Sequence, residues 1–453
     1  MSEIERELFQ AVSNGQNIVI HGPGGVGKSH ITRKIAAHFT YLGKIVCCTA
    51  TTGIAAINLS SAEHKISGST IHSWAGVGLA EAPPQKLVAR VTHDERARKR
   101  WRETDLLIID EISMLGAEFL DKLDFIGRDI RREKDKPFGG LQVIFIGDFL
   151  QLPPVNAKWA FQSFVWKEME ADGSLYPFVL DEPKRYDDVE WFKTLSRFRK
   201  ADHTPADVKF LHSRVKAYEE WLKSSSSSDI TSVKPTMLHS KKIDVEYQND
   251  RELRKLPGQP KEYIAIDTFK PYNAHARFDH YIKPFDDAIP KAIYLNVGAQ
   301  VMLKANLDIK GGLANGSRGV IVEIMHGSEH GVKVKWLSGS VTVVTAHTWS
   351  REDKDGCASR TQIPLILAWS LTIHKVQGST LDYCIADLGP SIFLEGQAYV
   401  ALSRVRSSNG LLLVEFYPPC IKANKEALAY VETMENIEIE YVYVLHYNGL
   451  DPE

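Results

Sequence analysis

The 453-residue sequence predicts an α/β protein with two α/β halves, of which the second is interrupted by a small antiparallel barrel. Apolar strand patterns alternate with helical patterns over residues 17–154, which is typical of a parallel, doubly wound sheet. Short alternating segments separated by glycine turns occupy residues 297–344 and predict antiparallel strands. Strand and helix patterns return after Pro364, so we expect the barrel to divide the second half.

The composition is that of an ordinary globular protein. Lys and Arg number 55 against 57 Asp and Glu, and the formal net charge is −2, so any nucleic-acid partner requires a local groove. The five cysteines show no C-x-x-C spacing and are expected to be reduced, as in an intracellular protein. The sequence does not distinguish between the nucleus, the mitochondrion and a prokaryotic or viral cytoplasm as the intracellular location. The sequence shows no signal-like segment and no run of about 18 apolar residues, so no membrane contact is expected.

The first strand pattern leads into the sequence HGPGGVGKS at residues 21–29, and a helical pattern follows. This is a complete G-x-x-x-x-G-K-S phosphate loop, whose backbone N–H groups can surround an anion at a helix N-terminus. A turn made only for tight packing is the alternative. We predict that Lys28 reaches the β and γ phosphates and that Ser29 ligates Mg²⁺. The loop residues predicted to bind the nucleotide are Gly22, Gly24, Gly25, Val26, Gly27, Lys28 and Ser29.

Two later strand patterns end in polar residues. Asp110 and Glu111 follow the apolar run at residues 106–109, and we predict that Asp110 holds Mg²⁺ while Glu111 deprotonates an attacking water. Gln151 follows the strand pattern at residues 143–146, where its amide could touch both the γ-phosphate and that water. Because carboxyl ends of parallel strands meet at one edge of a sheet, these residues are expected near the phosphate loop.

Two glycine-containing segments are candidates for contact with a phosphate backbone. Residues 49–56 (TATTGIAA) offer hydroxyl and N–H groups, and residues 68–78 (GSTIHSWAGVG) add a histidine and an aromatic ring. Taken singly, an ordinary βα turn and a loop with a core tryptophan are the simpler interpretations. The charged segment at residues 85–104, with Arg100 and Arg102, is predicted to be a solvated helix face, and a contact with DNA is the alternative.

Seven ordered motifs resemble those of superfamily 1 DNA helicases: HGPGGVGKS, TATTGIAA, GSTIHSWAGVG, IIDEISM, GDFLQLPPV, LAWSLTIHKVQGSTLD and GQAYVALSRVRS. The segments at residues 121–131 and 136–140 resemble the signature of the petite integration frequency (PIF) helicases of superfamily 1B, relatives of RecD. The resemblance implies two RecA-like P-loop NTPase domains with an SH3-like β-barrel inserted in the second. The implied domains are 1A (1–180), 2A (181–296 and 363–430), the insertion 2B (297–362) and a C-terminal extension (431–453).

The resemblance also implies residue roles. Arg185 and Arg404 would reach the γ-phosphate across the cleft, and Gln377 and Gly378 would line the nucleotide site. The residues implied to lie along single-stranded DNA are Thr52, Gly53, His72, Ser73, Thr372 and His374. Two departures stand out. Glu5 occupies the position where the family usually has a glutamine linked to adenine selectivity, and Lys184-Arg185-Tyr186 stands where the family often has phenylalanine, arginine and glutamine.

The expected function is therefore that of a DNA-stimulated ATP hydrolase that moves 5′ to 3′ on single-stranded DNA. It would use ATP and Mg²⁺ and unwind forked or structured duplexes in replication, repair, recombination or telomere maintenance, acting as a monomer. The rival hypothesis is a nucleotide-switched DNA-binding module that displaces proteins without separating strands.

Overall fold

The computed structural model describes residues 3–59, 66, 68–78, 80–186, 188–224, 233–273, 277–305, 307–308, 313, 316–325, 331–352, 356–381 and 383–447. Its first half is built on a six-stranded sheet in the order β3-β2-β4-β5-β1-β6, with all neighbouring strands parallel. The strands are β1 Asn17–His21, β2 Val46–Ala50, β3 Gly68–Thr70, β4 Leu106–Asp110, β5 Gln142–Gly147 and β6 Leu175–Val179. This is the doubly wound sheet that the alternating patterns predict.

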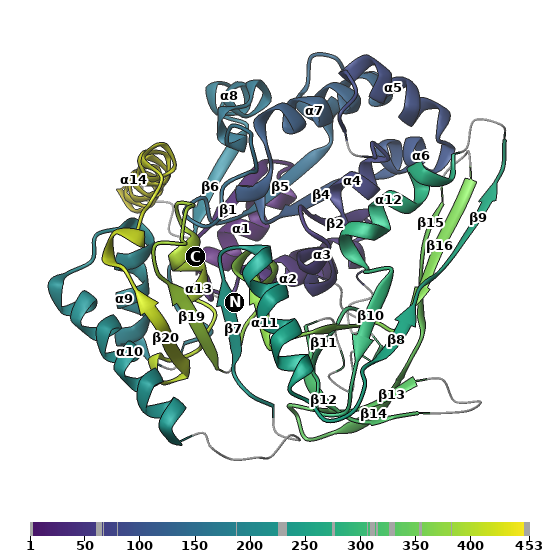
Figure 1. Ribbon diagram of the computed structural model, residues 1–453. Helices are drawn as coiled ribbons and strands as arrows, with labels where there is room; N and C mark the ends of the chain where they lie inside the picture. The colour runs from purple at the N-terminus through teal and green to yellow at the C-terminus, as the bar shows by residue number, and fades with distance from the viewer. Residues whose placement is uncertain are drawn as a thin grey trace.

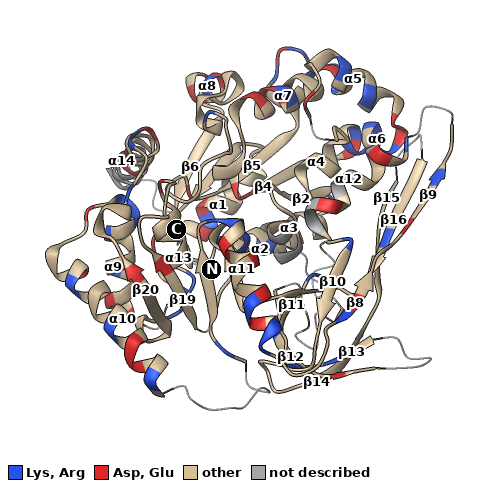
Figure 2. Ribbon diagram, viewed as in Figure 1, with Lys and Arg blue, Asp and Glu red and all other residues tan. Residues whose placement is uncertain are grey.

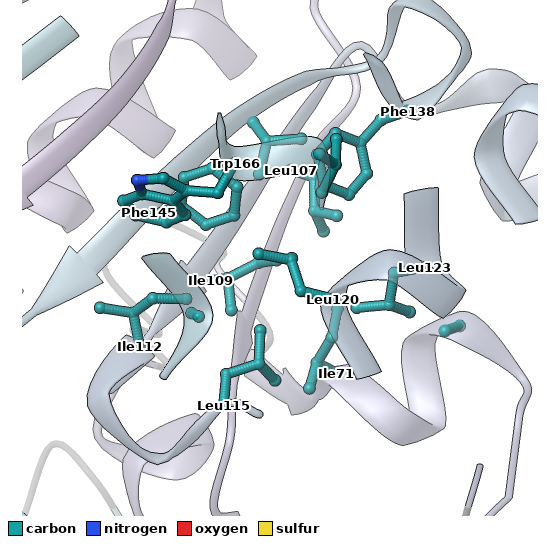
Figure 3. Packing of buried hydrophobic residues seen from close by; sticks show 14 of the residues in the cluster. Ile71, Leu107, Ile109, Ile112, Leu115, Leu120, Leu123, Phe138, Phe145 and Trp166 are labelled. Atoms are coloured by element: carbon teal, nitrogen blue, oxygen red, sulfur yellow. The ribbon is translucent and has the colours of Figure 1, made fainter. Parts of the chain in front are cut away.

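Helices cover both faces of this sheet, which explains its continuous apolar strands. One face carries α1 Glu3–Ser13, α2 Lys28–Tyr41 and α3 Gly53–Leu59; the other carries α4 Ile71–Ala75, α5 Pro84–His93, α6 Glu95–Glu103, α7 Ala117–Arg131 and α8 Phe164–Ala171 (Figure 1). Successive side chains of β4 alternate between the faces: Leu107 and Ile109 pack on the second set, and Ile108 on the first. Figure 3 shows the second layer, where side chains of β4 and β5 meet those of α4, α7 and α8.

The charged segment at residues 85–104 forms α5 and α6, and its charged side chains are exposed or half-buried, as expected for a solvated helix face. Trp101 is fully buried, and Arg100 donates from Nε to the Trp74 carbonyl at 2.7 Å and from Nη2 to the Ser73 carbonyl at 3.1 Å. Arg100 therefore satisfies carbonyls at the end of α4. Figure 2 shows basic and acidic residues interspersed over the helices, in keeping with the near-zero net charge.

The second half contains another parallel sheet, in the order β18-β7-β19-β20. Its strands come from two distant stretches of chain: β7 Thr236–His239, then β18 Ser370–Thr372, β19 Cys384–Leu388 and β20 Leu411–Phe416. Its helices are α9 Val189–Lys200, α10 Pro205–Ser224, α11 Lys242–Arg254 and α13 Gln397–Leu402. The chain is thus an α/β protein whose second sheet is split in sequence, as the returning pattern after Pro364 predicts.

Antiparallel strands and one helix, α12, occupy the interval between α11 and β18. A five-stranded sheet has the order β14-β13-β12-β11-β17, with β11 Gln300–Leu303, β12 Arg318–Ile324, β13 Gly331–Trp336, β14 Val341–Thr345 and β17 Leu365–Leu367. Two smaller antiparallel sheets have the strand orders β15-β16-β9 and β10-β8. Their strands are β8 Lys261–Ile264, β9 Ile266–Pro271, β10 Ala292–Leu295, β15 His347–Glu352 and β16 Gly356–Gln362. The helix α12, Phe278–Ala288, lies between β9 and β10 in the chain. The antiparallel region therefore extends beyond both ends of the predicted interval 297–362.

The C-terminal helix α14, Lys425–Tyr447, follows the second sheet but packs on the first half. The Tyr430 ring stacks on Phe161 with centroids 4.2 Å apart, and the Tyr430 hydroxyl accepts from Trp166 Nε1 at 2.7 Å and donates to Glu170 Oε1 at 2.6 Å. The predicted boundary between residues 430 and 431 falls inside this helix. Over the described part of the chain, no helix has both the length and the apolar character needed to span a bilayer.

Candidate active site

The phosphate loop joins β1 to α2 at the carboxyl edge of the first sheet, as predicted. Gly25 and Gly27 have φ of +90° and +94°, the left-handed region that favours glycine. A Cβ on Gly25 would lie 2.5 Å from the Tyr186 ring, so the loop is in close contact with the segment that carries Arg185. Lys28 Nζ donates to the carbonyls of Gly22 at 2.6 Å and Pro23 at 2.8 Å.

A cleft of about 250 Å³ opens beside this loop and is lined from both halves of the chain. Most predicted nucleotide-site residues line it. The lining residues are Gly24, Gly25, Gly27, Lys28, Ser29, His30, Arg33, Asp110, Glu111, Gln151, Lys184, Arg185, Gly378 and Arg404. Three predicted residues lie outside this lining: the Gly22 carbonyl holds Lys28, Val26 is buried, and Gln377 contacts Glu111 instead.

The two acids lie side by side at the end of β4. Burial, followed by the charge of Glu111, raises the pKa of Asp110 to about 7, although the Glu111 N–H at 2.8 Å and Lys28 oppose this. A buried carboxylate of this kind gains from a nearby cation, and Ser29 supplies a hydroxyl oxygen to the same cleft. Carboxylate and hydroxyl oxygens are the donors that Mg²⁺ prefers, so these two residues fit the predicted metal.

Glu111 is held in an uncommon conformation. Its φ is +55°, in the left-handed region, which costs a non-glycine residue on the order of 1–3 kcal/mol. The Thr51 hydroxyl donates to its carbonyl at 3.0 Å, and Gln377 Nε2 donates to its Oε2 at 3.0 Å. Gln377 comes from the second half, so the carboxylate is oriented from across the cleft.

Both predicted arginines line the cleft. Arg404 is 1% exposed, and its guanidinium donates to the carbonyls of Val400 at 2.7 Å and Ser379 at 3.1 Å and to the Ser403 hydroxyl at 2.7 Å. The Arg185 N–H donates to the Gly25 carbonyl at 2.9 Å. The second half thus presents two positive charges to the phosphate loop.

Sequence reasoning missed Tyr399 and a buried pair formed by Asp148 and Arg199. Tyr399, on α13, accepts from the Gly24 N–H at 3.0 Å through its hydroxyl, so it too joins the halves. Asp148 follows β5 within the motif that supplied Gln151, and a strand-end acid is a signal that could have been used. Arg199 carries no local signal among the charges of α9. Burial, followed by Arg199, lowers the pKa of His21 to about 3, and this neutral ring contacts Arg199 next to the loop.

The four residues predicted to face DNA from the first half lie on α4 or at the start of α3. Thr52 caps α3, accepting from the Ala55 N–H at 3.2 Å, and Gly53 is exposed. His72 stacks on Phe119 with centroids 4.2 Å apart, and burial lowers its pKa. Ser73 is exposed, although its backbone is engaged at both ends. The structure places these four outside the nucleotide cleft.

Of the two second-half residues, Thr372 ends β18 and His374 lies just after it. Thr372 accepts from the Lys375 N–H at 3.3 Å, and His374 lies in the next turn, where burial lowers its pKa. Thr372 also lines a second cleft, of about 690 Å³, between α11 and the strands β10, β17 and β18. Lys304 and Lys375 line it as well, and burial, with help from Lys375, lowers the pKa of Lys304 to about 8. Glu246, Asp250 and Asp286 also line this cleft, so its charge is mixed, and it was not predicted.

Two family descriptions match the chain. "PIF1-like helicase" matches residues 2–172, and "DNA helicase Pif1, 2B domain" matches residues 288–324. Among curated proteins, the ATP-dependent DNA helicase PIF1 of Danio rerio is 36% identical over 444 residues, covering 96% of this chain and 64% of that protein. The chain therefore spans less than two thirds of this relative's length.

Solved structures agree over nearly the whole chain. The Pif1 helicase from Candida albicans is 30% identical with a TM-score of 0.81, covering 96% of this chain and 99% of that one. A Pif1 helicase from Bacteroides in complex with ADP-AlF3 and ssDNA is 26% identical with a TM-score of 0.70, covering 96% and 97%. With this identity and coverage, and with the same motifs gathered around one cleft, the chain belongs to the PIF1-like helicase family.

Proposed function

We propose that the chain is an ATP-dependent DNA helicase that moves 5′ to 3′ on single-stranded DNA. One observation carries the proposal. The same cleft is lined by Lys28, Asp110 and Glu111 from the first half and by Arg185 and Arg404 from the second. A nucleotide in such a cleft touches both halves, so its hydrolysis changes the contact between them. That change is the source of a step along DNA.

The chemistry follows from the placement of each group. The loop N–H groups and Lys28 bind the phosphates, and Ser29 and Asp110 hold Mg²⁺, which supplies charge neutralisation when bound. Glu111 accepts a proton from the attacking water, and Gln151 orients that water. The two arginines stabilise the charge that develops on the γ-phosphate, a contribution of about 10³–10⁵ in turnover where such residues have been removed.

DNA is proposed to run over the carboxyl edges of both parallel sheets. The supporting residues in the first half are Thr52, Gly53, His72 and Ser73. In the second half, Thr372 and His374 lie next to the cleft lined by Lys304 and Lys375. Backbone contacts of this kind bind without regard to base sequence and weaken with salt. The Bacteroides relative described in complex with ssDNA supports binding to single-stranded DNA.

We further propose the domain assignment that the resemblance implies. The two parallel sheets correspond to RecA-like domains, and the five-stranded antiparallel sheet to an SH3-like 2B insertion. The match to the Pif1 2B description over residues 288–324 supports the second assignment. The protein is proposed to act inside the cell. It is also proposed to act as a monomer, and sedimentation at assay concentration would check this oligomeric state.

A strand-release assay tests the function. Two labelled duplexes, one with only a 5′ single-stranded tail and one with only a 3′ tail, are each mixed with the protein, with and without ATP and Mg²⁺. Strand release that requires ATP and a 5′ tail is the expected result. DNA-stimulated ATP hydrolysis without strand release would favour the rival switch module, and release from the 3′-tailed duplex alone would contradict the proposed direction.

A further inference from the structure

A buried ion pair joins the two halves directly behind the nucleotide cleft. Asp148, just after β5, is fully buried, and Arg199, near the end of α9, is 4% exposed. Arg199 Nε and Nη2 donate to Asp148 Oδ1 at 3.0 and 2.9 Å, and Nε lies 3.1 Å from Oδ2. Two guanidinium nitrogens on one carboxylate fix its orientation as well as its position.

The arginine is carried by the second half. The apolar residues of α9, Trp191, Leu195 and Phe198, pack in the core cluster that also holds the side chains of α13, β19 and β20. Asp148 instead continues β5 of the first sheet. The pair therefore crosses from one half to the other, and separation of the halves would pull Arg199 away from Asp148.

Asp148 in turn holds the glutamine of the cleft. Its Oδ2 accepts from Gln151 Nε2 at 3.3 Å, and its Oδ1 accepts from the Leu150 N–H at 3.1 Å. Gln151 lines the cleft and is 5% exposed, and its Oε1 has no hydrogen-bond partner among the described residues. With its nitrogen tied to Asp148, the amide has a free acceptor for a water beside the γ-phosphate.

We propose that Arg199 is a positioning residue for ATP hydrolysis: from the second half it fixes Asp148, and Asp148 fixes the Gln151 amide that orients the attacking water. This inference rests on the proposed function, because it concerns the same cleft. Its consequence is that the water is correctly oriented only while α9 is docked on the first half. Closure of the halves is thereby linked to catalysis through a residue that touches neither nucleotide nor DNA.

The competing explanation is that the pair only stabilises the fold. Removing one partner leaves a buried charge and destabilises a protein, whereas replacing both by apolar residues of similar shape is often tolerated. The informative variant is therefore Asp148→Leu/Arg199→Met, in which leucine repeats the branched shape of aspartate. Arg199→Lys keeps the charge but loses the contact through two guanidinium nitrogens. This variant tests the inference if the double variant does not fold.

The chain offers a matched control on the same helix. Arg197 lies two residues before Arg199 and pairs with Asp207 at 2.6 Å, but it is about one third exposed and does not line the cleft. Asp207 also accepts from the Thr204 N–H and hydroxyl, each at 2.8 Å, so it keeps partners when Arg197 is changed. Arg197→Met should leave hydrolysis unchanged.

The test is steady-state ATP hydrolysis on single-stranded DNA, with thermal melts to verify folding. The double variant should lose about 100-fold in kcat, the cost of misplacing a reacting group by about 1 Å, with KM for ATP changed by less than about threefold. In a Gln151→Ala background, the same two substitutions should cause no further loss, because their effect passes through that amide. Arg199→Lys should lose about tenfold in kcat by the same reasoning.

Three outcomes would overturn the inference: wild-type kcat in the folded double variant, wild-type kcat in Arg199→Lys, or a loss that multiplies with that of Gln151→Ala. If the proposed function is wrong, the unaltered protein will show no DNA-stimulated ATP hydrolysis. That result would overturn both the proposed function and the inference about Arg199.

Discussion

Replacing Gly378 by alanine should slow hydrolysis by displacing Glu111 without removing it. Gly378 has φ +75°, and a Cβ there would lie 2.9 Å from Glu111 Oε1, whereas ordinary contact begins at 3.4 Å. The carboxylate must therefore move by about 0.5 Å, the difference between these distances. The shift also disturbs the 3.0 Å hydrogen bond from Gln377 Nε2, because its acceptor, Oε2 of Glu111, belongs to the same carboxylate.

The expected magnitude follows from this displacement. A misplacement of about 1 Å costs about 100-fold in rate, so half of it should cost about tenfold in kcat, or about 1.4 kcal/mol of barrier. Alanine in the left-handed region costs a further 1–2 kcal/mol or so of folding free energy. Gly378 lines the cleft but does not belong to the phosphate loop, so ATP affinity should change less than kcat.

Steady-state hydrolysis and equilibrium ATP binding separate these effects, and Gly15→Ala is the matched control. Gly15 has φ +78°, but a Cβ there meets nothing within 4 Å, so it shares the backbone cost without displacing any group. A Gly378→Ala protein that hydrolyses ATP as fast as the Gly15→Ala protein would refute the role assigned to the Glu111 position.

Three further results are expected. Glu111→Gln should lower kcat by about 10²–10⁴ while ATP still binds, since only the general base is lost; unchanged turnover would exclude that role. Arg404→Ala should lower kcat by about 10³ or more with little change in equilibrium ATP affinity, and a defect in affinity alone would count against it. Because burial raises the pKa of Asp110 to about 7, its proton must leave before it can ligate Mg²⁺. Mg²⁺-dependent ATP binding, measured by titration calorimetry, should therefore strengthen from about pH 6 to about pH 8, and Asp110→Asn should flatten this profile.

The residues of the nucleotide site could be predicted where they belong to a short sequence motif. Lys28, Asp110 and Glu111 lie at strand ends within recognisable patterns, and the structure brings them to one cleft. Arg199 and Tyr399 could not be found this way, because their partners lie 51 and 375 residues away in sequence. Only the packing of the two halves brings those pairs together. The roles of the residues facing DNA stay predictions.

In the fold, too, some elements could be predicted from local sequence patterns and others could not. Buried parallel strands such as β4 give continuous apolar runs, which are easy to recognise in a sequence. The strands β8 and β9 are half-exposed and mixed in composition, so residues 234–290 carried little signal. The helix α14 was not predicted, and nothing local in its sequence indicates that it returns to the first half.

That return gives the protein an unusual order of assembly on the ribosome. Ala427, Val431 and Met434 complete a hydrophobic core whose other members belong almost entirely to the first 175 residues. Roughly 250 residues separate Val179, the end of the first sheet, from Met434, so at about 5–20 residues per second the gap is open for about 12–50 s. During that time the surface around Phe161 and Trp166 lacks its cover and is open to chaperones. The part of the molecule that emerges first is thus the last to be finished.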